Sequence, residues 1–192
     1  MNAKLRAIVV TGTPGTGKTE FSKKLSKKIG YKYLDLNQFL IENGCYTGFD
    51  SRRKTYVINV DLGRKMFLEK FKDGKYVVES HISHLIIPKK LVEICFVLRA
   101  SPYVLIERLR SKMEEDKAIE NCSAEILDIV LSEALNEYGP ELVCELDTTS
   151  ESVEKIVDRA LRIIKGKEEK KIRIVNWLRL VYERGDLSKF FK

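Results

Sequence analysis

The chain has 192 residues, 44% of them hydrophobic, which suits one compact domain and excludes an intrinsically disordered chain. Lysine and arginine number 35 against 28 aspartates and glutamates, and the formal net charge of +7 favours polyanionic partners such as nucleotides or RNA. Residues 165–192 hold nine basic and four acidic side chains, a net charge of +5, so the basic character belongs mainly to the carboxy-terminal tail.

The cysteines and the apolar segments exclude further classes. The four cysteines include no C-x-x-C pair, which argues against a zinc ribbon or a redox pair and suits a reducing compartment. The first apolar run, residues 5–11, is too short for a signal peptide, and no stretch approaches the roughly 18 apolar residues of a membrane span. We expect a soluble, cytoplasmic protein with no membrane partner.

Apolar runs of strand length alternate with segments of helical periodicity along most of the chain. Strands are expected at residues 5–11, 31–36, 75–80, 94–99 and 142–146. Helices are expected near residues 18–29, 61–71, 102–112, 118–138 and 152–164. This alternation indicates an α/β fold with a parallel sheet covered by helices on both faces.

Two segments lie outside the alternation. Residues 37–60, with Gly44, Gly48 and the run SRRK, are expected to form an insertion of short helix and loop. The charged run KEEKK at 167–171 precedes an amphipathic segment that we expect to lie on the core as an appendage, burying Trp177, Leu178 and Val181. The alternative is that this basic tail contacts RNA or an acidic partner.

The segment GTPGTGKT, residues 12–19, matches the pattern G-x-x-x-x-G-K-[ST] between a predicted strand and a predicted helix. Glycines let backbone N–H groups approach phosphate oxygens, and the following helix presents its positive end to the same anion. Lys18 would bridge the β- and γ-phosphates, and the Thr19 hydroxyl would ligate Mg²⁺. We predict an ATP site at Gly15, Thr16, Gly17, Lys18, Thr19 and Glu20.

Both histidines of the chain lie in the segment VESHISH. In a strand Glu79 and His81 share one face, so both could point at a ligand beyond the strand's end. Glu79 would orient Mg²⁺ through its waters, and His81 would position water or polarise a phosphoryl oxygen. A zinc site formed with His84 is a weaker alternative. A structural role, satisfied by neighbouring carbonyls, is the alternative for His81 and the expectation for His84. Arg99, at the end of another strand, either faces the ligand or anchors the next helix.

Together with two further segments, FVLRASPYVLIERL (96–109) and ENCSAEILDIVLSEA (120–134), these motifs resemble the adenylate kinase family shared by archaea and the eukaryotic nucleus. The resemblance implies a P-loop kinase fold with a five-stranded parallel sheet over residues 1–166. It also implies a monophosphate-binding region at about 35–58, a short lid at about 111–117, and a carboxy-terminal extension over 167–192.

The resemblance also assigns site residues. The family's D-x-H motif reads Glu79-Ser80-His81 here, which implies Lys18, Glu79 and His81 as catalytic residues and Thr19 with Glu79 as Mg²⁺ ligands, directly or through water. Lys112 stands where many members have an arginine in the lid, which implies that Lys112 and Arg108, one turn earlier, bind ATP. The family's monophosphate-binding arginine aligns with Ile41, which leaves Asp50, Arg52 and Arg53 as the candidates for that contact.

The implied function is a nucleoside monophosphate kinase that transfers the terminal phosphate of ATP to AMP or another monophosphate, with ATPase activity and Mg²⁺ as cofactor. The family is implicated in maturation of the small ribosomal subunit and its 16S rRNA. The alternative is an ATPase switch that holds a small-subunit ribosomal protein, with pre-rRNA as a further partner and little kinase activity.

Overall fold

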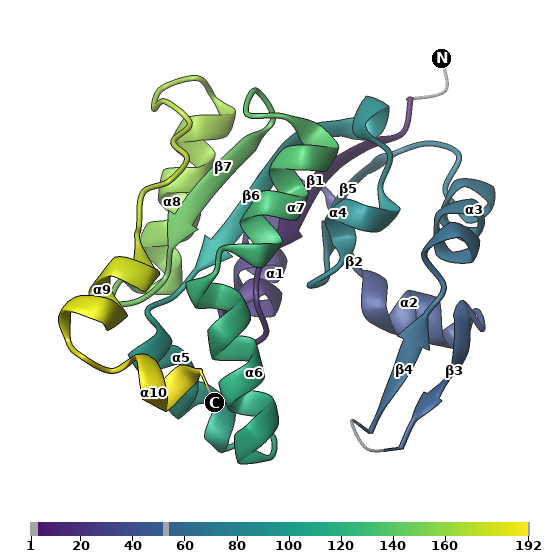
Figure 1. Ribbon diagram of the computed structural model, residues 1–192. Helices are drawn as coiled ribbons and strands as arrows, with labels where there is room; N and C mark the ends of the chain where they lie inside the picture. Colours follow the sequence, from purple (N-terminus) through teal and green to yellow (C-terminus); the bar gives the residue numbers. More distant parts are fainter. Residues whose placement is uncertain (1–3, 52–53, 192) are drawn as a thin grey trace.

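A computed structural model describes residues 4–51 and 54–191, and its centre is a five-stranded parallel sheet (Figure 1). The strands are β1 (Arg6–Thr11), β2 (Lys32–Asp35), β5 (Lys75–Glu79), β6 (Val92–Arg99) and β7 (Val143–Asp147). Their order across the sheet is β2-β5-β1-β6-β7, and every neighbouring pair is parallel. The α/β fold with a parallel sheet is therefore confirmed.

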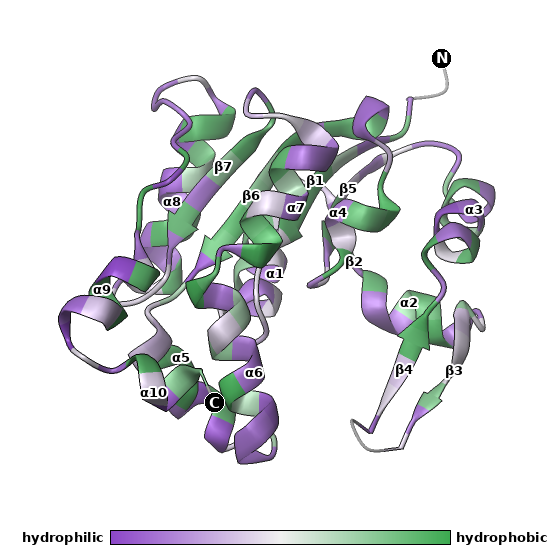
Figure 2. Cartoon of the chain, in the orientation of Figure 1, coloured by the Kyte–Doolittle hydropathy of each residue, from purple (hydrophilic) through white to green (hydrophobic). Residues whose placement is uncertain are grey.

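Helices cover both faces of the sheet. They are α1 (Lys18–Ile29), α2 (Leu36–Glu42), α3 (Val60–Lys70), α4 (Ser83–Ile86), α5 (Pro102–Arg110), α6 (Glu115–Ile126), α7 (Ile129–Tyr138), α8 (Val153–Ile164), α9 (Trp177–Glu183) and α10 (Leu187–Phe190), with a 3₁₀ turn at Lys89–Leu91. Ala7 and Val9 of β1 pack with α2, α3, α4 and α7, whereas Ile8 and Val10 pack with α1 and α8. Successive residues of a buried strand thus contact two apolar layers, one on each face of the sheet. Figure 2 shows hydrophobic strands flanked by helices whose outer faces are hydrophilic.

A third apolar cluster joins the extension to helices α5 and α6. Trp177, Val181 and Phe190 are buried there against residues that include Leu105 and Leu109. Burial of Trp177 and Val181 agrees with the expected amphipathic appendage. The same expectation is wrong for Leu178, whose side chain is 45% exposed.

The helix expected over residues 118–138 is wrong as a single element, because α6 ends at Ile126 and α7 begins at Ile129. Between them Asp128 adopts a left-handed conformation with φ of 55°, and its carboxylate accepts a hydrogen bond from Arg99. Apolar periodicity runs through the break, so the pattern gave no sign of it. The break places an acidic side chain against a buried guanidinium.

The inserted segment also differs from expectation. A short helix, α2, is present, but the expected loop is an antiparallel hairpin of β3 (Tyr46–Asp50) and β4 (Thr55–Ile58). The Tyr56 ring lies 4.5 Å from the Tyr46 ring and 5.2 Å from the Phe49 ring, centroid to centroid. Cross-strand aromatic contacts of this kind stabilise a hairpin that no Asn-Gly or Asp-Gly turn signal announces.

The connection between α5 and α6 is short. Helix α6 begins at Glu115, so residues 111–114 alone are non-helical within the expected lid of residues 111–117. Across the described parts of the chain, no helix is long and apolar enough to span a bilayer.

The Arg99 side chain forms three ion pairs in the interior, and its exposed fraction is 1%. Its Nε donates to Glu125 Oε1 at 2.7 Å, its Nη1 donates to Glu145 Oε1 at 2.5 Å, and its Nη2 bonds to Asp128. Burial opposes its charge, yet the three carboxylates hold the pKa of Arg99 above its ordinary value. Arg99 therefore anchors α6 and β7, whereas the predicted anchoring of the next helix, α5, is wrong.

Replacing Arg99 by leucine is expected to destabilise the fold by about 3–5 kcal/mol at pH 7, because Glu125 and Glu145 would remain buried without their cation. Burial already raises the pKa of Glu125, and loss of Arg99 raises it further. A carboxyl with a raised pKa destabilises the folded state only while it is ionised. The loss of unfolding free energy in Arg99→Leu should therefore shrink as the pH falls from 7 to 5.

Urea unfolding of the wild type and of Arg99→Leu at both pH values measures this deficit. Arg110→Leu is the matched control, because the Arg110–Glu115 pair is exposed and its loss should change little. A pH-independent deficit in Arg99→Leu would contradict the electrostatic explanation.

Candidate active site

The phosphate-loop sequence connects the end of β1 to the start of α1. Gly12 has φ of +140°, and a Cβ at this position would lie 2.4 Å from the Leu98 carbonyl oxygen. No other residue fits that approach without moving the backbone of β6. The loop is therefore held against the neighbouring strand, at the carboxyl edge of the sheet where ligands bind in folds of this type.

Helix α1 presents its amino-terminal end to the loop. Its N-cap, Gly17, has φ of 88°, and no side-chain hydrogen bond caps the helix within the described structure. The first-turn N–H groups are thus available to an anion, and the helix dipole favours negative charge at the same place.

The Thr13 carbonyl oxygen is the centre of the loop's internal bonding. It accepts hydrogen bonds from Lys18 Nζ at 3.0 Å, from Thr16 Oγ1 at 2.8 Å and from the Thr16 amide at 3.3 Å. Lys18 is only 9% exposed, and burial lowers its pKa to about 8, although the charges of Glu79 and Glu125 counteract part of the shift. Because the buried amine bonds to a single carbonyl oxygen, a phosphate in the loop can replace that contact.

Glu79 stands beside Thr19, as the metal prediction requires. Its Oε1 accepts hydrogen bonds from Thr19 Oγ1 at 2.9 Å and from the Tyr33 hydroxyl at 3.0 Å, and the residue is 4% exposed. The carboxylate is thus bonded to neutral hydroxyls, with the Lys18 charge nearby. Oxygen donors that face the phosphate loop in this way suit a divalent cation that prefers hard ligands.

The histidines have different surroundings. Strand β5 ends at Glu79 and His81 lies in a turn, so the expectation that strand alternation places these two side chains on one face is wrong. His81 is exposed overall, but the surrounding chain desolvates its ring. This desolvation, followed by the charges of Lys18, His84 and Lys117, lowers the pKa of His81 to about 4. It is a neutral imidazole near the charged amine of Lys18 at physiological pH.

His84 is fully buried and its ring nitrogens have structural partners. Nδ1 lies 3.0 Å from Thr11 Oγ1, and Nε2 lies 3.0 Å from Glu133 Oε2. Among the residues that the structure describes, no group of three or more His, Cys, Asp or Glu side chains could hold a metal ion. The zinc alternative with Glu79, His81 and His84 is therefore wrong.

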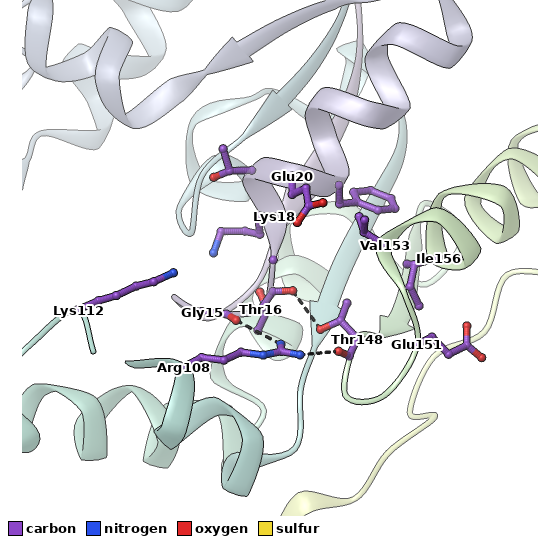
Figure 3. Close-up of a pocket in the computed structure, with 13 residues that line it drawn as sticks. Gly15, Thr16, Lys18, Glu20, Arg108, Lys112, Thr148, Glu151, Val153 and Ile156 are labelled. Carbon is purple, nitrogen blue, oxygen red and sulfur yellow. Dashed lines mark hydrogen bonds between the residues drawn. The ribbon is translucent and has the colours of Figure 1, made fainter. Parts of the chain in front are cut away.

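A cavity of about 490 Å³ lies over the phosphate loop. Gly15, Thr16, Gly17, Lys18, Thr19 and Glu20 all line it, as do Arg108 and Lys112, so every residue predicted for ATP lies together here (Figure 3). Arg108 donates to the Gly15 and Thr148 carbonyl oxygens at 3.4 and 3.0 Å, which fixes its guanidinium as one wall. The Glu20 carboxylate pairs with Lys24.

A second cavity of about 490 Å³ shares Lys112 with the first. It lies between the β3–β4 hairpin and the start of α6, where Lys54 Nζ lies 2.9 Å from Glu114 Oε1. Asp50 is half-buried near the hairpin tip, opposite Thr55. Arg52 and Arg53, the other residues predicted for a monophosphate, lie outside the described residues.

Several residues of the site were not predicted. Thr148, Glu151, Val153 and Ile156 line the first cavity from the loop before α8 and from that helix. Glu125 reaches the phosphate loop from α6, where its Oε2 accepts a hydrogen bond from Thr13 Oγ1 at 2.6 Å. An acidic residue between the apolar positions Cys122 and Ile126 is a sign of a buried polar contact, which is the one signal the sequence offered.

The loop, the buried lysine and the parallel sheet define the class: this is a P-loop nucleotide-binding α/β protein. A protein-family model described as an AAA domain matches residues 8–128, and the chain belongs to that family.

Its relatives include archaeal proteins that carry the name "Putative adenylate kinase". The protein of Pyrococcus abyssi is 38% identical over 172 residues, which is 88% of this chain and 90% of the relative. That of Saccharolobus islandicus is 40% identical over 155 residues, 80% of this chain and 81% of the relative.

Two solved structures share the fold at low sequence identity. Shikimate kinase from Bacteroides thetaiotaomicron has a TM-score of 0.54 at 18% identity, over 83% of this chain and 98% of its own. A gluconokinase from Sinorhizobium meliloti has a TM-score of 0.55 at 16% identity, over 85% of this chain and 94% of its own. These likenesses support the fold alone.

The lowered pKa of Lys18 predicts how anion binding depends on pH. With a pKa of about 8 in the empty loop, the amine loses its charge as the pH rises, whereas a bound phosphate would raise that pKa. ATP affinity should therefore be constant near pH 7 and fall by up to about tenfold per unit above pH 8. Calorimetric titration between pH 7 and 9.5 measures the slope, and Lys18→Ala should remove it. A wild-type affinity that stays constant to pH 9.5 would refute the assignment.

Proposed function

We propose that the protein is a nucleoside monophosphate kinase, which transfers the terminal phosphate of ATP to AMP or another nucleoside monophosphate and hydrolyses ATP when no acceptor is bound. The observation that carries the proposal is the pair of adjoining cavities that share Lys112, one of them over the phosphate loop. Each volume suits a nucleotide-sized ligand. The names of the archaeal relatives support the same reaction.

In the donor site, the loop amides and the positive end of α1 would bind the phosphates of ATP, and Lys18 would leave the Thr13 carbonyl to contact the β- and γ-phosphates. Arg108, fixed by two backbone carbonyls, would offer its planar face to the base. Lys112 stands between the two cavities, where negative charge develops as the phosphoryl group moves.

Mg²⁺ fits the donor set, because the Thr19 hydroxyl and the Glu79 carboxylate supply neighbouring oxygens beside the loop. When bound there, directly or through water, it would neutralise charge on the β- and γ-phosphates. Tyr33 holds the Glu79 carboxylate from the other side, which restricts its rotation. These residues need no general base, since positioning and electrostatics supply most of the catalysis in phosphoryl transfer.

The acceptor would bind beside the hairpin, with Asp50, Arg52 and Arg53 as the proposed contacts. The Lys54–Glu114 ion pair connects the hairpin to the α5–α6 connection, so both elements border the same cavity. Closing of the connection around Lys112 would exclude water from the phosphoryl group and so limit hydrolysis.

The test is product analysis. The wild type is incubated with ATP and Mg²⁺, with and without each nucleoside monophosphate, and the nucleotides are separated. We expect two diphosphates from ATP plus AMP or another monophosphate, and no turnover with EDTA or in Lys18→Ala. ATP consumed at one rate whether or not any monophosphate is present, with no second diphosphate, would overturn the kinase proposal.

That contrary result would favour the second candidate, an ATPase switch in small-subunit maturation that binds a ribosomal protein and pre-rRNA in the cytoplasm. One observation favours a polyanionic partner such as pre-rRNA. Five basic residues of the extension and its start are exposed: Lys165, Lys167, Lys170, Lys171 and Arg173. A basic surface of this size attracts polyanions without making them substrates.

His81 is expected to act on turnover rather than on nucleotide binding. The imidazole is neutral above pH 5 and lies near the Lys18 charge, so it can position a water or a phosphoryl oxygen by hydrogen bonding. His81→Ala should lower kcat by about tenfold to a hundredfold and leave the KM for ATP within a factor of two. Steady-state kinetics measure both, with His81→Gln as the variant that keeps a hydrogen-bonding group. An unchanged kcat in His81→Ala would return His81 to a structural role.

A further inference from the structure

One buried carboxylate, that of Glu125, touches both the phosphate loop and the carboxy-terminal extension. Its Oε2 accepts a hydrogen bond from Thr13 Oγ1 at 2.6 Å, and its Oε1 accepts one from the indole Nε1 of Trp177 at 3.2 Å. Glu125 is 2% exposed and Trp177 is 8% exposed. A residue in the loop and the first residue of α9 are thus joined through a single side chain.

The orientation of this carboxylate is fixed. Oε1 also accepts hydrogen bonds from Arg99 Nε at 2.7 Å and from the Ala100 amide at 3.2 Å. The carboxylate cannot rotate without breaking charge-assisted bonds in a region of low dielectric. One carboxylate that does not rotate therefore holds Thr13 and Trp177 in a fixed relation to each other.

At the loop, Thr13 is the residue whose carbonyl holds Lys18 Nζ at 3.0 Å. A phosphate that attracts Lys18 removes this donor from the Thr13 carbonyl, so the set of bonds that holds Thr13 changes when a nucleotide binds. The hydroxyl bond to Glu125 is the contact that keeps Thr13 in register with α6 during that change.

At the other end, the extension is docked at several points outside the loop. The Ile174 amide donates to Glu145 Oε2 at 3.1 Å, and the Tyr103 hydroxyl donates to Asp186 Oδ2 at 2.9 Å. Figure 1 shows α9 and α10 lying beside α5 and α6. Within this docked segment, Trp177 is the residue that bonds to Glu125 and is connected through it to the phosphate loop.

We propose that Trp177 is a positioning residue for the phosphate loop, and that docking of the extension and binding of ATP are coupled through Glu125 and Thr13. The coupling is reciprocal, so a nucleotide in the loop changes the surroundings of Trp177, and loss of the Trp177 contact weakens nucleotide binding. The inference rests on ATP binding at the loop, which is a premise of the proposed function.

The chain has one tryptophan, so emission excited selectively from tryptophan comes from Trp177 and reports on its surroundings. Titration of the wild type with ATP and Mg²⁺ should shift the Trp177 emission and saturate at the dissociation constant found by calorimetry. In Thr13→Val, which keeps the shape of the side chain and removes its hydroxyl, the emission change at saturating ATP should be reduced by at least half. A merely structural Trp177 would not respond to the nucleotide.

Trp177→Phe keeps an aromatic ring in the apolar cluster and removes the N–H donor. We expect its dissociation constant for ATP, measured by calorimetry, to rise by about fivefold to tenfold. Tyr103→Phe is the matched control, because it also removes one hydrogen bond between core and extension but not one that leads to the loop. It should lower the melting temperature comparably and leave ATP affinity within a factor of two.

The outcomes separate this inference from the proposed function. If the wild type binds ATP but its emission does not change at saturation, or if Trp177→Phe binds ATP as tightly as the wild type, the coupling is overturned while the kinase proposal stands. If the wild type does not bind ATP, both are overturned. Should Trp177→Phe fail to fold, the comparison of the wild type with Thr13→Val decides.

Discussion

The buried guanidinium of Arg99 is the constraint on which much of the arrangement depends. Removing such a charge from water costs several kcal/mol unless acidic groups surround it, and here they come from α6, from the turn after α6, and from β7. The break after α6 lies beside the same guanidinium, and there the Asp128 carboxylate accepts a hydrogen bond from Arg99 Nη2. The requirement for acidic groups also explains how the extension finds its place, because Glu145 and Glu125 keep acceptors for the Ile174 amide and the Trp177 indole.

The nucleotide site itself works against stability. Lys18 is buried with a pKa lowered to about 8, Glu79 is buried against hydroxyls, and Gly12 adopts a conformation that other residues avoid. Burial of the Lys18 amine and the uncapped start of α1 are costly in an empty site and become favourable when anionic phosphates bind, because the ligand supplies the countercharge for both. The apolar layers on both faces of the sheet stabilise the fold enough to tolerate these features.

Features set by local sequence were predictable, and features set by distant partners were not. The parallel strands and helix α1 follow from apolar periodicity, and the phosphate loop from its glycines and Lys18, so the cavity residues Gly15 to Glu20 could be placed before the structure was known. The hairpin depends on ring contacts between Tyr46, Phe49 and Tyr56, which no turn signal marks. Strand alternation predicts that His81 shares a face with Glu79, whereas the backbone turns after Glu79. The role of Glu125 depends on Thr13, 112 residues away in the chain, and no local pattern encodes such a pair.

The excess positive charge of the chain lies mainly in the extension, and the two sides of the extension differ in what they contact. Its inner side carries Trp177, Val181 and Phe190 into an apolar cluster and reaches the carboxylates around Arg99. Its outer side carries the exposed lysines Lys165, Lys167 and Lys171, and Glu168 pairs with Arg159 and Arg162 of α8 instead of with them. A polyanion that binds the outer lysines therefore has no need to displace Trp177, whereas a ligand that competes for the apolar cluster must remove it from Glu125. If Trp177 is coupled to the loop as proposed, the two kinds of partner differ in effect: the first leaves ATP affinity unchanged, and the second lowers it.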